Sequence, residues 1–138
     1  MAQLKGLPNV ADTYVFTILL TDASTPAKSD SKNFRIQVYD TLTIQTNLLD
    51  DAEYEVPYED HIQVSGGKTP YIWRLVDSRL PDGIQLNHSN GELSGSLMNI
   101  NTKSSEFTIQ VKDNNQPSEI IEKTFTIFVV EKTFNCYR

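Results

Sequence analysis

Residues 106–112 read EFTIQVK, and this stretch decides the fold class. Phe107, Ile109 and Val111 alternate with polar residues, so every second side chain is apolar. A period of two is the pattern of a β-strand that buries one face. A second stretch with the same alternation follows at residues 125–129. The sequence therefore predicts two neighbouring strands that each contribute one face to a core.

The same pattern occurs earlier in the chain. Shifting the sequence by 91 residues aligns residues 16–38 with residues 107–129 and gives 9 identities in 23 positions, where chance would give about one or two. Asp22 then falls on Asp113. Residues 41–131 number 91, which equals the shift. We therefore expect three parts: the last two strands of an incomplete preceding repeat at 1–40, a complete repeat at 41–132, and a tail at 133–138.

The remaining strands of the complete repeat are short. Alternating or β-branched stretches predict strands at residues 41–46, 62–64 and 71–76. Turn signals separate them, because glycine, asparagine and proline favour the backbone angles of tight turns. These signals are Gly66-Gly67, Pro81-Asp82-Gly83 and Asn90-Gly91. No window shows a sustained helical period, so we expect an all-β, antiparallel sandwich of about seven strands with an additional hairpin.

Composition excludes several classes of protein. With 12 basic and 18 acidic residues, the formal net charge is −6, and no Lys/Arg cluster predicts a nucleic-acid or anionic-membrane surface. No apolar run approaches the roughly 20 residues of a membrane helix, and the first ten residues lack the apolar stretch of a secretory signal. Cys136 is the only cysteine, which excludes an internal disulfide and a multi-thiolate metal site.

Five motifs follow one another in the order and spacing of a known family. They are Asp51-Ala52 with Val64-Ser65-Gly66-Gly67, then PYIWRL at 70–75, LPDGIQLN at 80–87, NGELSG at 90–95 and FTIQVKD at 107–113. Residues 41–130 resemble the immunoglobulin-like repeat of bacterial surface proteins, which is similar to the dystroglycan-type cadherin-like domain. Residues 4–38 resemble the terminal half of such a repeat. The resemblance implies an immunoglobulin-like or cadherin-like sandwich, and the family has no shared catalytic site.

The resemblance also implies a setting and a role. Such repeats occur in tandem in large secreted or cell-surface proteins, so neighbouring repeats are the implied partners. We expect a non-enzymatic spacer or adhesive unit, located extracellularly or at the cell surface. Two alternatives stay open: a carbohydrate-binding module that takes a polysaccharide, with or without calcium, and an assembly element that self-associates through residues 1–40.

Aromatic residues are candidates either for a core or for a sugar-stacking platform. Trp73, the only tryptophan, shares a strand face with Tyr71 and Leu75. In immunoglobulin-like sandwiches a tryptophan on this strand fills the core. We therefore predict Trp73 and Tyr71 as core residues, together with Phe107 and Phe125.

Calcium is the one metal that the sequence leaves open. Asp22 and Asp113 each begin a polar loop that resembles the loop between the last two strands of cadherins. The other ligand motifs of cadherins are missing: residues 98–101 read MNIN, and residues 38–42 offer a single carboxylate. Because calcium takes six to eight oxygen ligands, a multi-ion cluster is not expected. A single weak site at Asp22 or Asp113 stays open, as does a structural role in which each carboxylate orders its own turn.

Catalytic constellations are not expected. His61 and His88 lack a second ligand at metal-binding spacing and are interpreted as solvated residues. The most acidic window lies within residues 50–60, whereas a glycosidase needs two carboxylates that face each other across a cleft. We interpret this window as a charged surface that discourages edge pairing.

Overall fold

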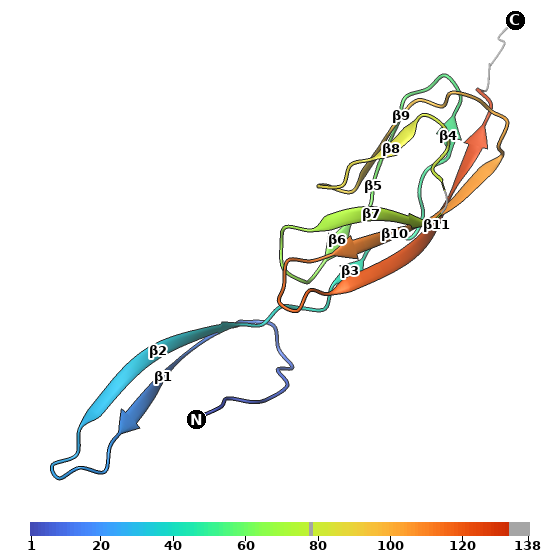
Figure 1. The fold of residues 1–138 in the computed structure, drawn as a ribbon. Coiled ribbons are helices and arrows are strands. Elements are labelled where there is room, and N and C mark those ends of the chain that lie inside the picture. The colour runs from blue at the N-terminus through green and yellow to red at the C-terminus, as the bar shows by residue number, and fades with distance from the viewer. Residues whose placement is uncertain (78, 133–138) are drawn as a thin grey trace, which may run out of the picture. The chain divides into compact units, whose positions relative to one another are not determined.

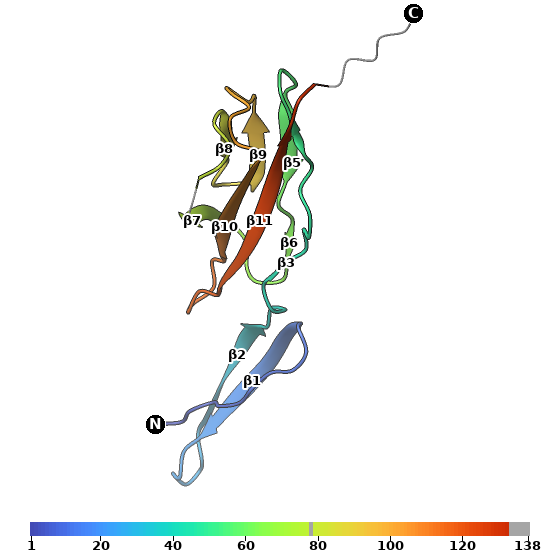
Figure 2. The same cartoon turned by 90° about the vertical axis from the view of Figure 1, so that its right-hand side faces the viewer.

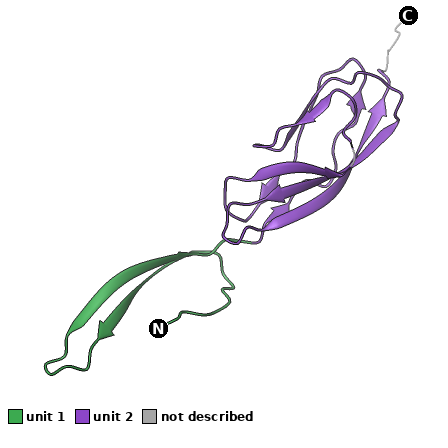
Figure 3. Cartoon of the chain, in the orientation of Figure 1, with its two compact units in different colours: residues 1–40 green, residues 41–138 purple. Residues whose placement is uncertain are grey.

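The computed structural model describes residues 1–77 and 79–132. The chain divides into two compact units, residues 1–40 and residues 41–138 (Figure 3). The tail predicted at 133–138, with Cys136, lies outside the described residues. Each unit is an all-β structure, and no helix occurs among the described residues. Accordingly, no described helix has the length and apolar character needed to cross a membrane.

The first unit is built around one antiparallel hairpin. Strand β1 (Thr13–Thr21) pairs with β2 (Ser29–Gln37) along its whole length without a bulge (Figure 1). The register places Phe16 opposite Phe34, and their rings stack with centroids 5.9 Å apart. The alternation of apolar residues in both strands puts their apolar side chains on one face, which we call the inner face of the hairpin.

The second unit, residues 41–138, contains the remaining strands. A four-stranded sheet has the order β4-β11-β10-β7, a three-stranded sheet the order β5-β9-β8, and β3 pairs with β6 (Figures 1 and 2). The strands are β3 (Thr43–Ile44), β4 (Ala52–Glu53), β5 (Tyr58–His61), β6 (Val64–Ser65), β7 (Ile72–Asp77), β8 (Ile84–Leu86), β9 (Glu92–Gly95), β10 (Ser104–Lys112) and β11 (Ile120–Val130).

One hydrophobic core fills this second unit. The inner faces of β10 and β11 supply five of its side chains, because their apolar residues alternate along both strands. The opposite strands and loops supply the others, and the T-shaped pair of Trp73 and Tyr71 lies at its side. The buried core residues are Leu42, Ile44, Ala52, Tyr58, Ile62, Trp73, Ile84, Leu93, Leu97, Phe107, Ile109, Val111, Phe125 and Ile127.

Several details differ from the sequence-based prediction. The second unit has nine described strands where about seven were expected, and the strand expected at 41–46 is limited to Thr43–Ile44. The strand expected at residues 62–64 is displaced: Ile62 and Gln63 lie between β5 and β6, and only Val64 is in a strand. Ile62 is nevertheless buried, so its apolar character reflects the core rather than a strand. In addition, β4 pairs with β11 in parallel, whereas the other pairings are antiparallel. A parallel pair joins residues distant in sequence, which local alternation does not reveal.

Candidate functional site

The loop between β10 and β11 is organised by the carboxylate of Asp113, which is only 3% exposed. Its Oδ1 accepts hydrogen bonds from the backbone N–H of Glu119 (2.7 Å) and of Asn115 (3.2 Å). Its Oδ2 accepts a bond from the backbone N–H of Lys68 at 3.1 Å. The carboxylate therefore connects its own turn to the loop between β6 and β7.

The partner loop is shaped to receive this carboxylate. Gly67 has a φ of +62°, and a Cβ at this position would lie 3.0 Å from Oδ2 of Asp113, so glycine suits both the backbone angle and the close approach. Burial opposes the charged form of Asp113. The backbone N–H groups of Glu119, Lys68 and Asn115 outweigh that effect and hold the pKa of Asp113 below its ordinary value.

Asp22 organises the matching loop between β1 and β2 in the same way, but its carboxylate is exposed to solvent. Its Oδ1 accepts hydrogen bonds from the backbone N–H of Lys28 (2.8 Å) and of Ser24 (3.1 Å). The Ser24 hydroxyl, followed by the backbone N–H groups of Lys28 and Ser24, lowers the pKa of Asp22. Unlike Asp113, Asp22 is exposed, and these hydrogen bonds all come from residues of its own turn.

Neither loop assembles a set of charged metal ligands. Among residues 1–77 and 79–132, no group of three or more His, Cys, Asp or Glu side chains is placed to hold a metal ion. Each of the two aspartates carries hydrogen bonds from backbone N–H groups within its turn. Calcium binding at Asp22 or Asp113 stays a prediction that only solution measurements test.

The predicted core aromatics lie as follows. Trp73 is 5% exposed, and Phe107 and Phe125 are buried with ring centroids 6.2 Å apart. Tyr71 is half-buried, and its hydroxyl donates to the carbonyl of Gly66 at 2.7 Å. Nε1 of Trp73 is buried and makes no hydrogen bond within the described part of the chain.

A shallow hollow lies over Tyr71 and Trp73. Polar side chains of His61, Gln63 and Asn90 share its lining with the two aromatic residues. Because Trp73 is covered almost completely, only Tyr71 offers part of an aromatic ring to solvent here. Sugar rings stack on exposed aromatic faces, so this hollow is a smaller platform than a pair of exposed rings would make.

The two histidines make local polar contacts. Nδ1 of His88 lies 2.7 Å from the carbonyl oxygen of Trp73, and the Trp73 N–H donates to the carbonyl of His88. Nε2 of His61 lies 3.9 Å from Oε2 of Glu92. Both residues are exposed overall, and they lie on different strands and turns. They therefore do not form a common site.

The acidic window at residues 50–60 is used in part to build β5 and its approach. Oδ2 of Asp60 accepts a hydrogen bond from the Asp50 backbone N–H at 2.9 Å. The Tyr58 hydroxyl donates to the Asp50 carbonyl at 3.1 Å. Burial, followed by the negative charges of Asp60 and Asp50, raises the pKa of Tyr58, so its hydroxyl stays protonated. These contacts hold a turn together and place no two carboxylates across a cleft.

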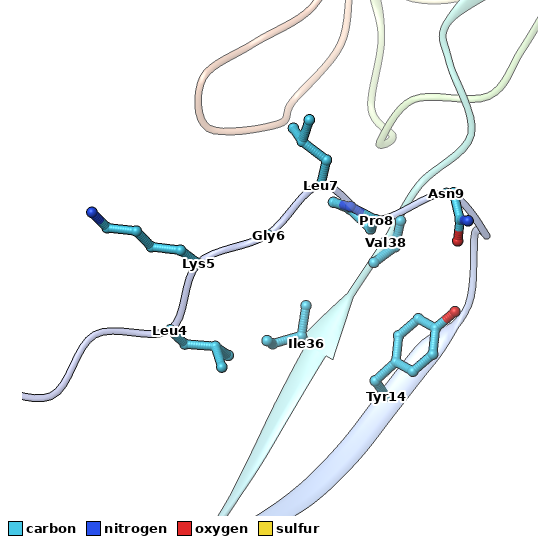
Figure 4. A pocket seen from close by; sticks show the side chains of 9 residues that line it. All are labelled: Leu4, Lys5, Gly6, Leu7, Pro8, Asn9, Tyr14, Ile36 and Val38. Carbon is cyan, nitrogen blue, oxygen red and sulfur yellow. The ribbon is translucent and has the colours of Figure 1, made fainter.

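The hairpin carries a hollow that sequence reasoning did not predict. Residues 4–9 run past the inner face and line this hollow together with Tyr14, Ile36 and Val38. In Figure 4 the Leu4 side chain points towards Ile36. The only sequence signal was the match of Leu4 and Gly6 to Leu93 and Gly95 upstream of the repeated strands. That match indicated that the repeat extends upstream of β1, but it did not indicate where residues 4–9 would lie.

Comparison with known families gives one match. The family described as "Putative Ig domain" matches residues 40–130, which is more than half of the chain. The matched segment contains the strands β3 to β11 together with the Asp113 turn. No curated protein matches the sequence.

Solved structures with the same fold include cadherin repeats. Extracellular cadherin domains 3–6 of protocadherin gamma B2 are similar with a TM-score of 0.57 and 13% identity, over 87% of this chain and 34% of that one. Domains EC1–3 of mouse clustered PcdhgC3 give a TM-score of 0.51 and 19% identity, over 86% of this chain and 43% of that one. This chain thus spans less than half the length of either.

An enzyme is also among the similar structures. The endo-fucoidan hydrolase MfFcnA4, of glycoside hydrolase family 107, gives a TM-score of 0.51 and 16% identity. The similarity covers 89% of this chain but 19% of the hydrolase. At these identities the likeness concerns the fold alone.

Proposed function

The chain belongs to the Putative Ig domain family, and from this premise we propose that it is a non-catalytic repeat module of a larger extracellular or cell-surface protein, in which it works as a spacer. One observation carries the proposal. In the unit formed by residues 41–138, the chain enters at β3 and leaves from the end of β11, and these two points lie at opposite ends of the unit (Figures 1 and 2). A module connected at opposite ends adds its length to a string of modules.

The chemistry of the side chains supports a structural role. Trp73, Phe107 and Phe125 are buried in the core, and the Asp113 carboxylate is hydrogen-bonded to backbone N–H groups of two loops. These aromatic rings and this carboxylate therefore stabilise the fold and are not presented to a ligand. The cadherin repeats with the same fold come from extracellular regions of their own proteins, which favours the same location for this chain.

Pulling on single molecules tests the spacer role. The intact chain is held at its two ends and stretched. Because Ala52 and Val129 belong to a parallel pair between β4 and β11, a pull along the unit slides these strands past each other. We expect one cooperative unfolding event that releases about 300 Å, since an extended residue spans about 3.3–3.6 Å. Extension without any force peak would contradict the spacer role, while the fold itself would stand.

A second candidate function is carbohydrate binding at the hollow over Tyr71 and Trp73, since polar side chains of His61, Gln63 and Asn90 border the partly exposed ring. The fucoidan hydrolase in the comparison makes fucoidan a sensible probe. Trp73 is the only tryptophan, so its fluorescence reports on this hollow during a titration. The spacer proposal expects no saturable change. A saturable change that Tyr71→Ala abolishes would instead favour the binding module.

A further inference from the structure

The edge of β1 that faces away from β2 corresponds to an edge of β10 that another strand covers in the second unit. Under the 91-residue shift, β1 corresponds to β10, and β10 pairs on one side with β11 and on the other with β7. The backbone of Thr108, Gln110 and Lys112 lies opposite β7. In residues 1–40, β1 pairs with β2 alone, so the edge that corresponds to the β7 side has no strand beside it.

The hydrogen-bond pattern identifies the backbone groups at this edge. The Val38 N–H donates to the Asp12 carbonyl, and the Asp22 N–H donates to the Lys28 carbonyl. In an antiparallel ladder such bonded pairs recur at every second residue, so the even-numbered residues of β1 bond to β2. The N–H and C=O groups of the odd-numbered residues point to the free edge. Asp12 occupies one of them, the Thr13 N–H, with its carboxylate.

The side chains along this edge are unusually apolar on both faces. On the face opposite the inner face, Val15 and Leu19 are 70% and 65% exposed. The corresponding residues of β10 are Glu106 and Gln110, as expected for the solvent side of a sandwich. The repeat therefore does not explain Val15 and Leu19. No residue from Thr13 to Thr21 carries a charge, and charged residues commonly protect exposed edges from pairing.

We propose that the free edge of β1 pairs with the β1 edge of a second copy of this chain, antiparallel and about a two-fold axis at Thr17. Residues whose numbers sum to 34 then lie opposite each other. Thr17 faces its own copy, Val15 faces Leu19, and Phe16 faces Ile18. Odd-numbered residues face odd-numbered residues, so the free N–H and C=O groups of Val15, Thr17 and Leu19 meet their complements. At the ends of the contact, the Thr13 N–H keeps its bond to the Asp12 carboxylate.

This arrangement accounts for the distribution of apolar and charged residues. Val15 and Leu19 form two cross-strand apolar contacts on the outer face, and Phe16 and Ile18 form two on the inner face, where such pairs stabilise a sheet. The charges of the hairpin strands, Asp30, Lys32 and Arg35, all lie on β2. They occupy the outer strands of the resulting order β2-β1-β1-β2, so no charge is desolvated at the new contact. The pairing depends on residues 13–21 and is independent of the proposed spacer function.

Sedimentation of the intact chain tests the dimer. Thr17→Lys places two like charges opposite each other on the axis and is expected to weaken self-association about tenfold or more. Asn33→Lys is the matched control, because Asn33 is the partner of Thr17 on β2 and lies one strand from the edge. Both variants lose the same hydrogen bond, from Thr17 Oγ1 to Asn33 Oδ1. A monomeric wild-type chain at high micromolar concentration overturns the proposal, and so does equal weakening by both variants.

Disulfide trapping tests the register. In a Cys136→Ser background, Thr17→Cys places two cysteines in a directly opposed pair, about 5.5 Å apart at Cα, which suits a disulfide. Val15→Cys places them four residues out of register, about 13 Å apart. Oxidation with diamide should cross-link the Thr17→Cys chain into a dimer at least several times faster than the Val15→Cys chain. Equal rates, or faster cross-linking of the Val15→Cys chain, overturn this pairing. This holds even if the two copies form a dimer through another face of the hairpin.

Discussion

The two hairpins of this molecule, β1–β2 and β10–β11, share local geometry but differ in burial. In each, a phenylalanine pair faces across the strands, a lysine Nζ lies 5.7 Å from the centroid of a phenylalanine ring, and an aspartate accepts backbone hydrogen bonds in the turn. Yet Ile18 is 48% exposed and Leu20 72%, while the corresponding Ile109 and Val111 are fully buried. Register and turn geometry thus come from the hairpin sequence, whereas burial comes from the strands around it.

The largest expected difference in unfolding free energy is between alanine variants of Phe107 and Phe16, which occupy matching positions in the two hairpins. Phe107→Ala should lower the free energy of unfolding of the second unit by about 3–5 kcal/mol, because it leaves a cavity in the core. Phe16→Ala should change it by less than about 0.5 kcal/mol, as for substitutions away from that core. Denaturant unfolding followed by Trp73 fluorescence reports on the second unit alone.

The milder variant Phe107→Leu covers the case in which the alanine variant does not fold. It should cost about 1–1.5 kcal/mol, since its volume is closer to that of the original side chain. Similar losses for Phe16→Ala and Phe107→Ala would show that the first hairpin stabilises the second unit, and the comparison would fail.

Replacing the turn aspartate should also cost more stability in the second unit than in the first hairpin. Asp113→Ala leaves three partly buried backbone N–H groups without their acceptor and is expected to destabilise the second unit by about 2–4 kcal/mol. Asp22→Ala frees N–H groups that water can reach. Its effect should be confined to faster amide exchange around Lys28, with no change in the Trp73 transition. Loss of stability from Asp22→Ala as large as that from Asp113→Ala would argue against burial as the cause.

Acid should reveal the same difference through protonation. The pKa of Asp113 is lower in the folded state than its ordinary value of 3.8. Its stabilising contribution is therefore complete above about pH 3.8, and it is lost as the pH falls through the folded pKa, because the unfolded chain takes up the proton first. Unfolding free energies of the wild type and of Asp113→Asn should converge as the pH decreases from 5 towards 2. A constant difference over this range would contradict the role of the ionised carboxylate.

Calcium is expected to have the smallest effect. A ligand at 100 times its dissociation constant adds about 2.7 kcal/mol to the native state, which in a domain of this size raises the melting temperature by many degrees. We expect a shift of less than about 2 °C between millimolar calcium and a chelator, because the described residues gather no set of three acidic or histidine ligands. A large shift abolished by Asp113→Asn but not by Asp22→Asn would place a calcium site in the second unit.

Much of the second unit could be predicted from its amino-acid sequence. Alternation in residues 106–112 predicted β10, and the family resemblance identified the immunoglobulin-like and cadherin-like fold that the comparisons show. The strand predicted at 62–64 was displaced because Ile62 is buried by the core while lying outside a strand. Short strands of two residues, such as β4, lack enough sequence to show a period.

The candidate sites were less accessible to sequence reasoning. The polar loops at Asp22 and Asp113 look alike in sequence, and either role, metal ligand or turn acceptor, fits such a loop. That Asp113 also accepts a bond from Lys68, 45 residues away, depends on Gly67 bringing a second loop against it. No local sequence pattern predicts a hydrogen bond between residues so far apart in the chain.

The amino-acid sequence by itself determined the all-β class and the positions of the two hairpins, because these depend on the alternation of apolar residues along the chain. It left the role of the aspartate loops open. Tertiary structure alone decided which copies of these features are buried. Ile109 and Val111 are covered because β7 and the opposite sheet converge on β10 through long-range pairings, whereas Ile18 and Leu20, with the same local pattern, stay exposed in the first unit. Burial is a property of the whole arrangement of strands, and a strand's own residues do not encode which neighbours reach it.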